Sequence, residues 1–181
     1  MRTQKILTLI SVVCLALGLA ACASAGRSNE PTTLRGANLP TEAAQQATSN
    51  TPLGQAVLRA VNNRRSATQL STNATLQRAA SVHAQDMALR NYQGHHSPEG
   101  LGPLDRVHAV DEDFRGQVAE NIWAGTELAG KSDDQMAIYI LEGWNNSPRH
   151  RNTLESATYA QTGVGVARKG NVIYVVQLFA R

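Results

Sequence analysis

The strongest constraint on the fold of this chain is a pair of apolar runs near its C-terminal end, residues 162–168 and 172–179. Lys169-Gly170 separates them and suits the tight turn of a β-hairpin. The earlier segments show mostly helical spacing. Because the helices come early and the hairpin comes last, the sequence predicts an α+β layered domain and not a doubly wound parallel sheet.

Apolar residues recur at helical spacing in residues 52–66. Residues 73–90 have the same character, with Asn73 or Thr72 available as the N-cap. A loop rich in proline and glycine follows at 94–103. The remaining expected elements are a short helix at 104–110, a strand at 117–124, a helix at 133–144 and a helical turn at 148–154.

The first 21 residues are typical of a secretory signal peptide. Two basic residues precede a run of 16 apolar or small residues, 6–21, which is shorter than the roughly 20 that a membrane-spanning helix needs. The segment Leu19-Ala20-Ala21-Cys22 resembles the bacterial lipobox, in which the cysteine is lipidated and becomes the new N-terminus. We therefore expect a lipoprotein signal peptide at 1–21 and a lipidated Cys22 that anchors the protein to a membrane. Cleavage at an ordinary Ala-x-Ala site, which would release a free secreted protein, is the alternative.

Residues 22–51 are expected to form a disordered tether, because they are polar and offer little apolar surface to offset the entropy lost on ordering. The folded domain is then expected at 52–181. This organisation predicts an extracytoplasmic protein of the cell envelope. The residue after the lipidated cysteine is Ala23 and not aspartate, which favours the outer membrane if the host has one.

Charge and cysteine content exclude several classes of protein. The chain has 17 basic and 14 acidic residues, and removal of Arg2 and Lys5 with the signal peptide reduces its net charge from +3 to +1. Nucleic-acid binding needs clustered Lys and Arg, and eight aromatic residues offer few platforms for base stacking, so no nucleic-acid partner is expected. Cys14 and Cys22 both precede the folded domain, which therefore has no disulfide framework and no cysteine-based zinc site.

Several segments, in their order along the chain, carry a resemblance to a known family. They are Val61-Asn62-Asn63-Arg64-Arg65, His95-His96-Ser97-Pro98-Glu99-Gly100, Leu104-Asp105-Arg106, Ala119-Glu120-Asn121-Ile122, the run Gly143-Trp144-Asn145-Asn146-Ser147-Pro148-Arg149-His150-Arg151-Asn152, and Thr162-Gly163-Val164-Gly165-Val166. The set resembles a bacterial member of the CAP superfamily (cysteine-rich secretory proteins, antigen 5, pathogenesis-related proteins) on a lipoprotein. The resemblance covers nearly all of residues 52–181. It implies a three-layer α–β–α sandwich, which agrees with the order of elements derived above.

The resemblance also implies a cleft that gathers two histidines and two glutamates. Glu120 matches one glutamate, and His150 matches the later histidine. The first histidine is His95 under the bacterial pattern His-x-x-Pro-x-Gly and His96 under the eukaryotic His-Ser-Pro; we prefer His95, because the downstream segment then aligns without a gap. The second glutamate falls at Ser147, which is a poor substitute as a ligand or a base.

The reduced set of two imidazoles and one carboxylate leaves three roles open. His95, Glu120 and His150 together are competent to bind a divalent metal, zinc or magnesium. They are equally competent in acid–base chemistry, because histidine titrates near neutral pH. The third role is purely structural, with the histidines hydrogen-bonded to loop backbone. A serine nucleophile is disfavoured, because the chain has no Gly-x-Ser-x-Gly motif.

Three classes of function remain. The first is a lipid-anchored binding or scaffolding module of the cell envelope, with a lipid or a cell-wall polymer as its ligand. The second is a metal-dependent hydrolase that acts on peptide or cell-wall substrates, and the third is a partner of another envelope protein. We favour the first, non-enzymatic class, because the resemblance implies secretion and the missing second glutamate counts against a hydrolase.

Overall fold

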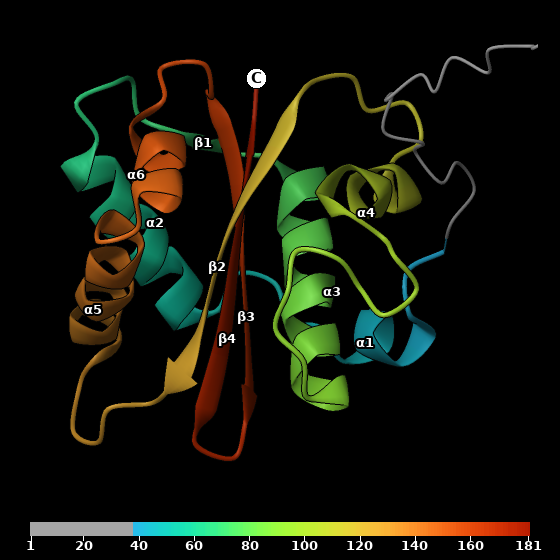
Figure 1. The fold of residues 1–181 in the computed structure, drawn as a ribbon, viewed down its shortest axis with the longest axis horizontal. Coiled ribbons are helices and arrows are strands. Elements are labelled where there is room, and N and C mark those ends of the chain that lie inside the picture. Colours follow the sequence, from blue (N-terminus) through green and yellow to red (C-terminus); the bar gives the residue numbers. More distant parts are fainter. Residues whose placement is uncertain (1–37) are drawn as a thin grey trace, which may run out of the picture. The chain divides into compact units, whose positions relative to one another are not determined.

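The computed structural model describes residues 38–181 (Figure 1). The expected signal peptide and the expected lipidation site at Cys22 lie outside these residues. Within the described part, the elements in chain order are α1 (Thr41–Gln46), α2 (Pro52–Arg64), β1 (Ser71–Thr72), α3 (Ala74–Arg90), α4 (Pro103–Val110), β2 (Val118–Thr126), α5 (Asp133–Asn145), α6 (Pro148–Glu155), β3 (Gln161–Lys169) and β4 (Val172–Ala180).

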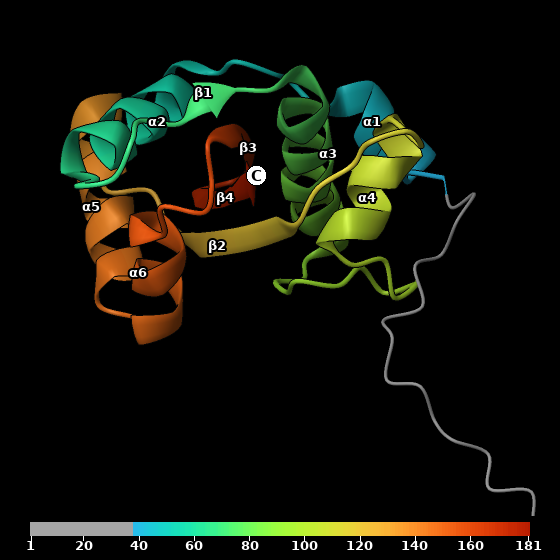
Figure 2. The ribbon, with the colours of Figure 1, turned by 90° about the horizontal axis from the view of Figure 1, so that it is seen from above.

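The elements form three layers with the sheet in the middle (Figure 2). The strand order is β1-β3-β4-β2. β4 pairs antiparallel with both of its neighbours, and β1 pairs parallel with β3. Helices α2, α5 and α6 cover one face, whereas α1, α3 and α4 lie on the other. This arrangement confirms the predicted α+β sandwich.

The start of the folded part was predicted incorrectly. Residues expected to belong to the disordered tether include the helix α1, which packs against α3. Ala43 is fully buried there, and the guanidinium of Arg78 donates to the backbone carbonyl of Ala44. Small alanines gave no periodic apolar signal, but they allow this short helix to lie close against the longer one. The two-residue strand β1 was also not predicted.

Local sequence explains where the main helices begin. Thr51 caps α2 by accepting a hydrogen bond from the amide of Gly54 at 3.1 Å. Asn73, one of the two expected caps, does the same for α3 through the amide of Leu76. Such caps satisfy amides that lack a partner within the helix.

Close packing of α3 on β3 depends on two glycines of the strand. A Cβ added at Gly163 would lie 2.2 Å from the backbone nitrogen of Gln77, and one added at Gly165 would lie 2.2 Å from the backbone of Ala80. No side chain fits in that space. The Gly-Val-Gly run therefore sets the distance between the sheet and the helix that leads to the candidate site.

Each face of the sheet carries its own hydrophobic cluster. The α2–α5 side is built around residues such as Trp144 and Phe179, and the α3 side around residues such as Leu76 and Leu178. Both clusters consist of residues within 38–181. This part therefore contains a hydrophobic core of its own, as a domain that folds independently does.

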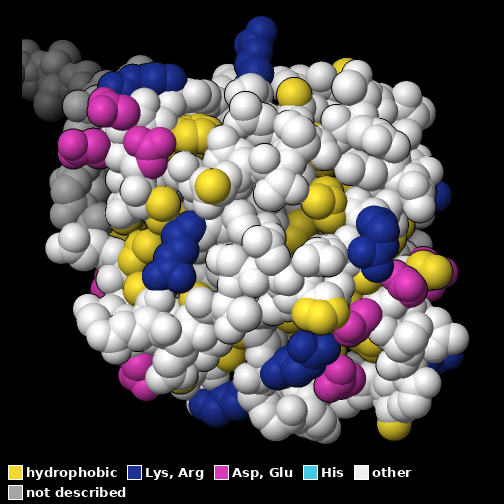
Figure 3. Space-filling model, turned by 180° about the vertical axis from the view of Figure 1, so that it is seen from behind, with side chains coloured by type: hydrophobic (Ala, Val, Ile, Leu, Met, Phe, Trp, Pro, Cys, Tyr) yellow, Lys and Arg dark blue, Asp and Glu magenta, His cyan; other side chains and the backbone are white. Residues whose placement is uncertain are grey.

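The face seen from behind Figure 1 carries basic and acidic side chains interspersed with one another (Figure 3). No large patch of one sign is visible on it. None of the helices in residues 38–181 is long and apolar enough to cross a bilayer.

Candidate functional site

The candidate site is built on Glu120, which lies near the start of the edge strand β2. Its side chain is only 1% exposed, and both carboxylate oxygens are occupied. Oε1 accepts a hydrogen bond from Nδ1 of His95 at 2.9 Å, and Oε2 accepts one from Nη2 of Arg106 at 2.6 Å. Sequence reasoning found Glu120 and His95 but not the role of Arg106.

Arg106 is the buried residue that connects the parts of the site. It lies on α4 and is 1% exposed. Besides binding Glu120, its Nη1 donates to the backbone carbonyls of His95 at 3.0 Å and Leu101 at 2.6 Å. One guanidinium thus ties both ends of the histidine-bearing loop to the edge strand. The motif Leu104-Asp105-Arg106 was the available sequence signal, but its spacing does not reveal that the arginine faces inward.

The electrostatics of Glu120 favour a permanent carboxylate. Burial alone would raise the pKa of its carboxyl. The charge of Arg106 and the hydrogen bond from His95 outweigh that effect, so the pKa lies below its usual value. A carboxylate only accepts hydrogen bonds, so Nδ1 of His95 carries the proton of this contact. When the imidazole is neutral, its Nε2 therefore holds a free lone pair.

The loop that carries His95 is also tied to α3. Nε2–H of the buried His83 donates to the carbonyl of Gly94 at 2.9 Å. Burial and the nearby charge of Arg106 lower the pKa of His83 to about 4. Farther along the loop, Glu99 forms an ion pair with Arg90. The sequence analysis did not single out this loop-supporting role of His83.

His150 reaches the site from the opposite layer of the sandwich. Neighbouring residues of a strand point to opposite faces of the sheet. Accordingly, Glu120 holds the α3–α4 side, while Nδ2 of Asn121 donates to the carbonyl of His150 on α6 at 3.1 Å. The Glu-Asn pair joins the two halves of the site because β2 lies at the edge of the sheet (Figure 2).

The two imidazoles meet beside this edge. The ring centroids of His95 and His150 are 6.5 Å apart, in an edge-to-face arrangement. The His95 side chain is 50% exposed, so it is open to a ligand. Partial burial and the neighbouring His95 lower the pKa of His150, which keeps its ring neutral at pH 7.

Two other expected site residues lie outside this contact. His96 is exposed, and its ring lies beside Gly102 instead of Glu120. Ser147 is the N-cap residue of α6, and its side chain makes no capping hydrogen bond. The structure thus brings together His95, Glu120 and His150, and its geometry agrees with the preference for His95 over His96.

The arrangement limits what metal the site fits. Within residues 38–181, no three His, Cys, Asp or Glu side chains are arranged to hold a metal ion together. Both oxygens of Glu120 are already bonded, so its carboxylate is not free as a third ligand. A carboxylate that orients a histidine through its second ring nitrogen is common behind metal-bound histidines, and Glu120 stands in that relation to His95. Only the two imidazoles remain as possible ligands, and nitrogen ligands suit zinc better than magnesium.

Comparison with known proteins finds similar sequences and similar solved structures. The sequence model of CAP, the cysteine-rich secretory protein family, matches residues 58–179. The uncharacterized protein YkwD of Bacillus subtilis is 26% identical over 103 residues, which are 57% of this chain and 37% of YkwD. The chain thus spans little more than a third of the length of that curated relative.

Solved structures show the same fold. An outer surface protein of Borrelia burgdorferi superposes with a TM-score of 0.63 at 19% identity, covering 75% of this chain and 96% of the other. An extracellular protein with an SCP domain from Bacillus anthracis gives a TM-score of 0.58 at 29% identity, over 71% of this chain and 40% of the other.

Proposed function

The chain belongs to the cysteine-rich secretory protein (CAP) family, and from that premise we propose that it is a lipid-anchored binding or scaffolding module of the cell envelope. In this proposal, lipidated Cys22 holds the domain to a membrane on the extracytoplasmic side. The pair formed by His95 and His150, named here the histidine cleft, contacts the ligand. The extracellular and outer-surface placement of the two structural relatives supports the compartment.

The observation that carries the proposal is that both carboxylate oxygens of Glu120 already accept hydrogen bonds. A general base needs a pKa near the working pH and must reach the substrate. Glu120 is buried, has a lowered pKa and is bonded through both oxygens. Its geometry supports a role in holding the cleft in one shape. Beside it lie the exposed ring of His95, held by Glu120, and the half-buried ring of His150, an arrangement that suits recognition better than proton transfer.

The alternative, a metal-dependent hydrolase acting on peptide or cell-wall material, has less support. Such an enzyme needs a base besides its metal ligands, and Glu120 is not free for that role. Ser147 does not replace the second glutamate. Divalent metal binding stays in the proposal as an accessory property, with zinc held by the two imidazoles.

Binding to envelope material tests the histidine cleft. The fragment 38–181 is mixed with envelope fragments of the producing bacterium and sedimented. We expect it to sediment with them and the double variant His95→Ala/His150→Ala to stay in solution. The control His108→Ala removes a histidine away from the cleft and should behave like the unchanged fragment. Equal sedimentation of the double variant would refute a binding role of the cleft.

Lipid anchoring needs its own test. Cells that express the full chain are labelled with radioactive palmitate, and we expect label on the unchanged chain but not on Cys22→Ala. Label that persists in this variant, or is missing from the unchanged chain, would refute the anchor.

Calorimetric titration with zinc chloride checks the accessory property, because His150→Ala should abolish one-to-one binding.

A further inference from the structure

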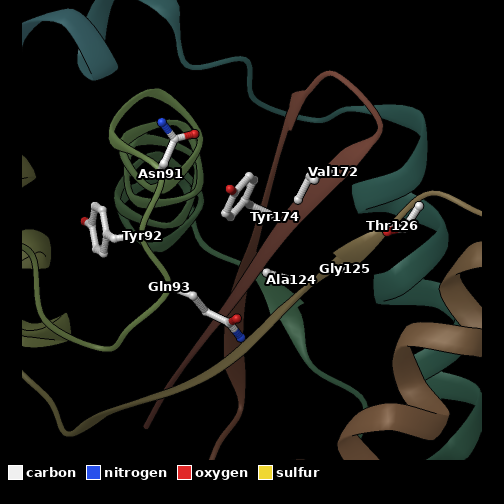
Figure 4. A pocket seen from close by; sticks show the side chains of 8 residues that line it. All are labelled: Asn91, Tyr92, Gln93, Ala124, Gly125, Thr126, Val172 and Tyr174. Atoms are coloured by element: carbon white, nitrogen blue, oxygen red, sulfur yellow. The ribbon is translucent and has the colours of Figure 1, made fainter.

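A second hollow lies away from the histidine cleft, between the C-terminal end of α3 and the ends of β2 and β4 (Figure 4). Its volume is about 280 Å³. It is lined by Asn91, Tyr92, Gln93, Ala124, Gly125, Thr126, Val172 and Tyr174. None of these residues carries a charge at neutral pH, and we call the hollow the neutral pocket.

Four polar side chains of the neutral pocket make no hydrogen bond within the described part of the chain; they belong to Asn91, Gln93, Thr126 and Tyr174. Tyr174 is only 8% exposed as a residue, but its hydroxyl is not among the buried polar atoms that lack a partner, so this hydroxyl opens into the hollow. Figure 4 shows this hydroxyl directed from β4 toward the end of α3. A hydroxyl that both donates and accepts, aimed into a hollow, indicates a ligand that completes its bonding.

Three further groups line the hollow without hydrogen-bond partners among the described residues. They are the amides of Asn91 and Gln93 and the hydroxyl of Thr126, and each both donates and accepts hydrogen bonds. Asn91 ends α3 in the left-handed conformation, with φ 56°, and its backbone amide bonds to the helix. Its side chain is therefore held at the rim before any ligand arrives. Tyr92 contributes mainly its ring, because its hydroxyl already donates to Asp86.

We propose that the neutral pocket binds a neutral saccharide unit. A sugar ring presents hydroxyls that donate and accept at once, and amide and hydroxyl side chains match that pattern. Its C–H face suits an aromatic ring, here that of Tyr174. The absence of charged lining disfavours phosphates and acidic or basic ligands, since a buried charge needs a partner. The volume lies just under the range of about 300–1,000 Å³ usual for ligand pockets, which suits one ring and not an extended segment.

This site is independent of the histidine cleft, with which it shares no residue. The inference therefore does not need a role of the histidine cleft; only the source of the sugar rests on the proposed envelope location. A glycan of the cell envelope is the source of neutral sugar that a domain displayed at that surface would meet.

Calorimetric titration of the full chain in detergent micelles tests the inference. The probes are the trisaccharide of N-acetylglucosamine, maltotriose and, for comparison, tri-alanine. We expect at least one of the two saccharides to bind. Tyr174→Phe removes one hydroxyl and should weaken that binding about three- to tenfold, the usual contribution of one hydrogen bond. The matched control Tyr159→Phe changes a tyrosine outside the pocket and should bind as the unchanged chain does.

A second variant distinguishes the loss of a ligand contact from a change in packing at the buried Tyr174. Gln93 lies on a loop at the surface, so Gln93→Ala should weaken saccharide binding by a similar factor without altering the fold. No binding of either saccharide, binding of tri-alanine alone, or pocket variants that bind as tightly as the unchanged chain would overturn the proposal. His95→Ala/His150→Ala should leave saccharide binding unchanged, which separates this test from that of the histidine cleft.

Discussion

Acidification from pH 7 to pH 5 is predicted to destabilise the fold through one buried imidazole, that of His83. Burial and the charge of Arg106 lower its pKa to about 4, against 6.5 for an unperturbed histidine. The unfolded chain therefore takes up a proton at this residue before the folded chain does. Stability is full above the unfolded pKa and falls as the pH decreases toward the folded value.

The size of the effect follows from the two pKa values. Each unit of difference corresponds to about 1.4 kcal/mol, so the full loss below pH 4 is about 3 kcal/mol. Between pH 7 and pH 5 the same relation gives about 2 kcal/mol. That is a large share of the roughly 5–15 kcal/mol that stabilises a typical domain.

Urea unfolding of the fragment 38–181, followed by tryptophan fluorescence at pH 7, 6 and 5, measures this loss. In His83→Gln, the side-chain amide is able to donate to the carbonyl of Gly94 but does not titrate. We expect the variant to lose about 2 kcal/mol less than the unchanged fragment over this range. His150, whose lowered pKa acts in the same direction, is present in both proteins and cancels in the comparison. A loss between pH 7 and pH 5 in His83→Gln equal to that of the unchanged fragment would refute the reasoning.

Three further predictions use the same unfolding measurement at pH 7. Gly165→Ala should cost about 1–3 kcal/mol because its methyl group collides with α3, whereas Gly94→Ala, which has room for the group, should cost less than about 1 kcal/mol. Glu120→Gln should cost about 3–5 kcal/mol because it leaves the guanidinium of Arg106 buried without its counter-charge, and a loss below about 1 kcal/mol would contradict that assignment. Trp144→Phe should cost about 1–2 kcal/mol because it removes the indole N–H that donates to a β2 carbonyl, and an unchanged midpoint would show that this bond contributes nothing.

The sequence alone predicted the eight principal helices and strands of residues 52–181 to within two residues at either end. Local information was sufficient there, because apolar spacing reports which face of an element is buried, and Pro, Gly and capping residues mark where elements end. Trp144 is an example of such burial, because it lies in the core and its indole N–H donates to the carbonyl of Ile122 at 2.9 Å.

The candidate site was predictable only through its motifs. Resemblance to a family led to His95, Glu120 and His150, which lie up to 55 positions apart in the chain. Nothing in the spacing of these residues would have placed them together. The choice between His95 and His96 rested on an alignment, whereas in the structure it rests on which ring reaches Glu120.

Tertiary structure decided what the site residues are able to do. The sequence left Glu120 available as a ligand or a base, but the fold buries it against Arg106 and His95 and so commits both of its oxygens. Tertiary contacts likewise decided the loop-supporting role of His83 and the formation of helix α1, which was expected to be part of a tether. Each of these outcomes depends on contacts between distant segments, and burial and electrostatic environment arise only when those segments pack. The sequence by itself therefore determined the elements and the list of candidate residues, and the packing of α3, α4 and β2 determined which of those residues remain free to meet a ligand.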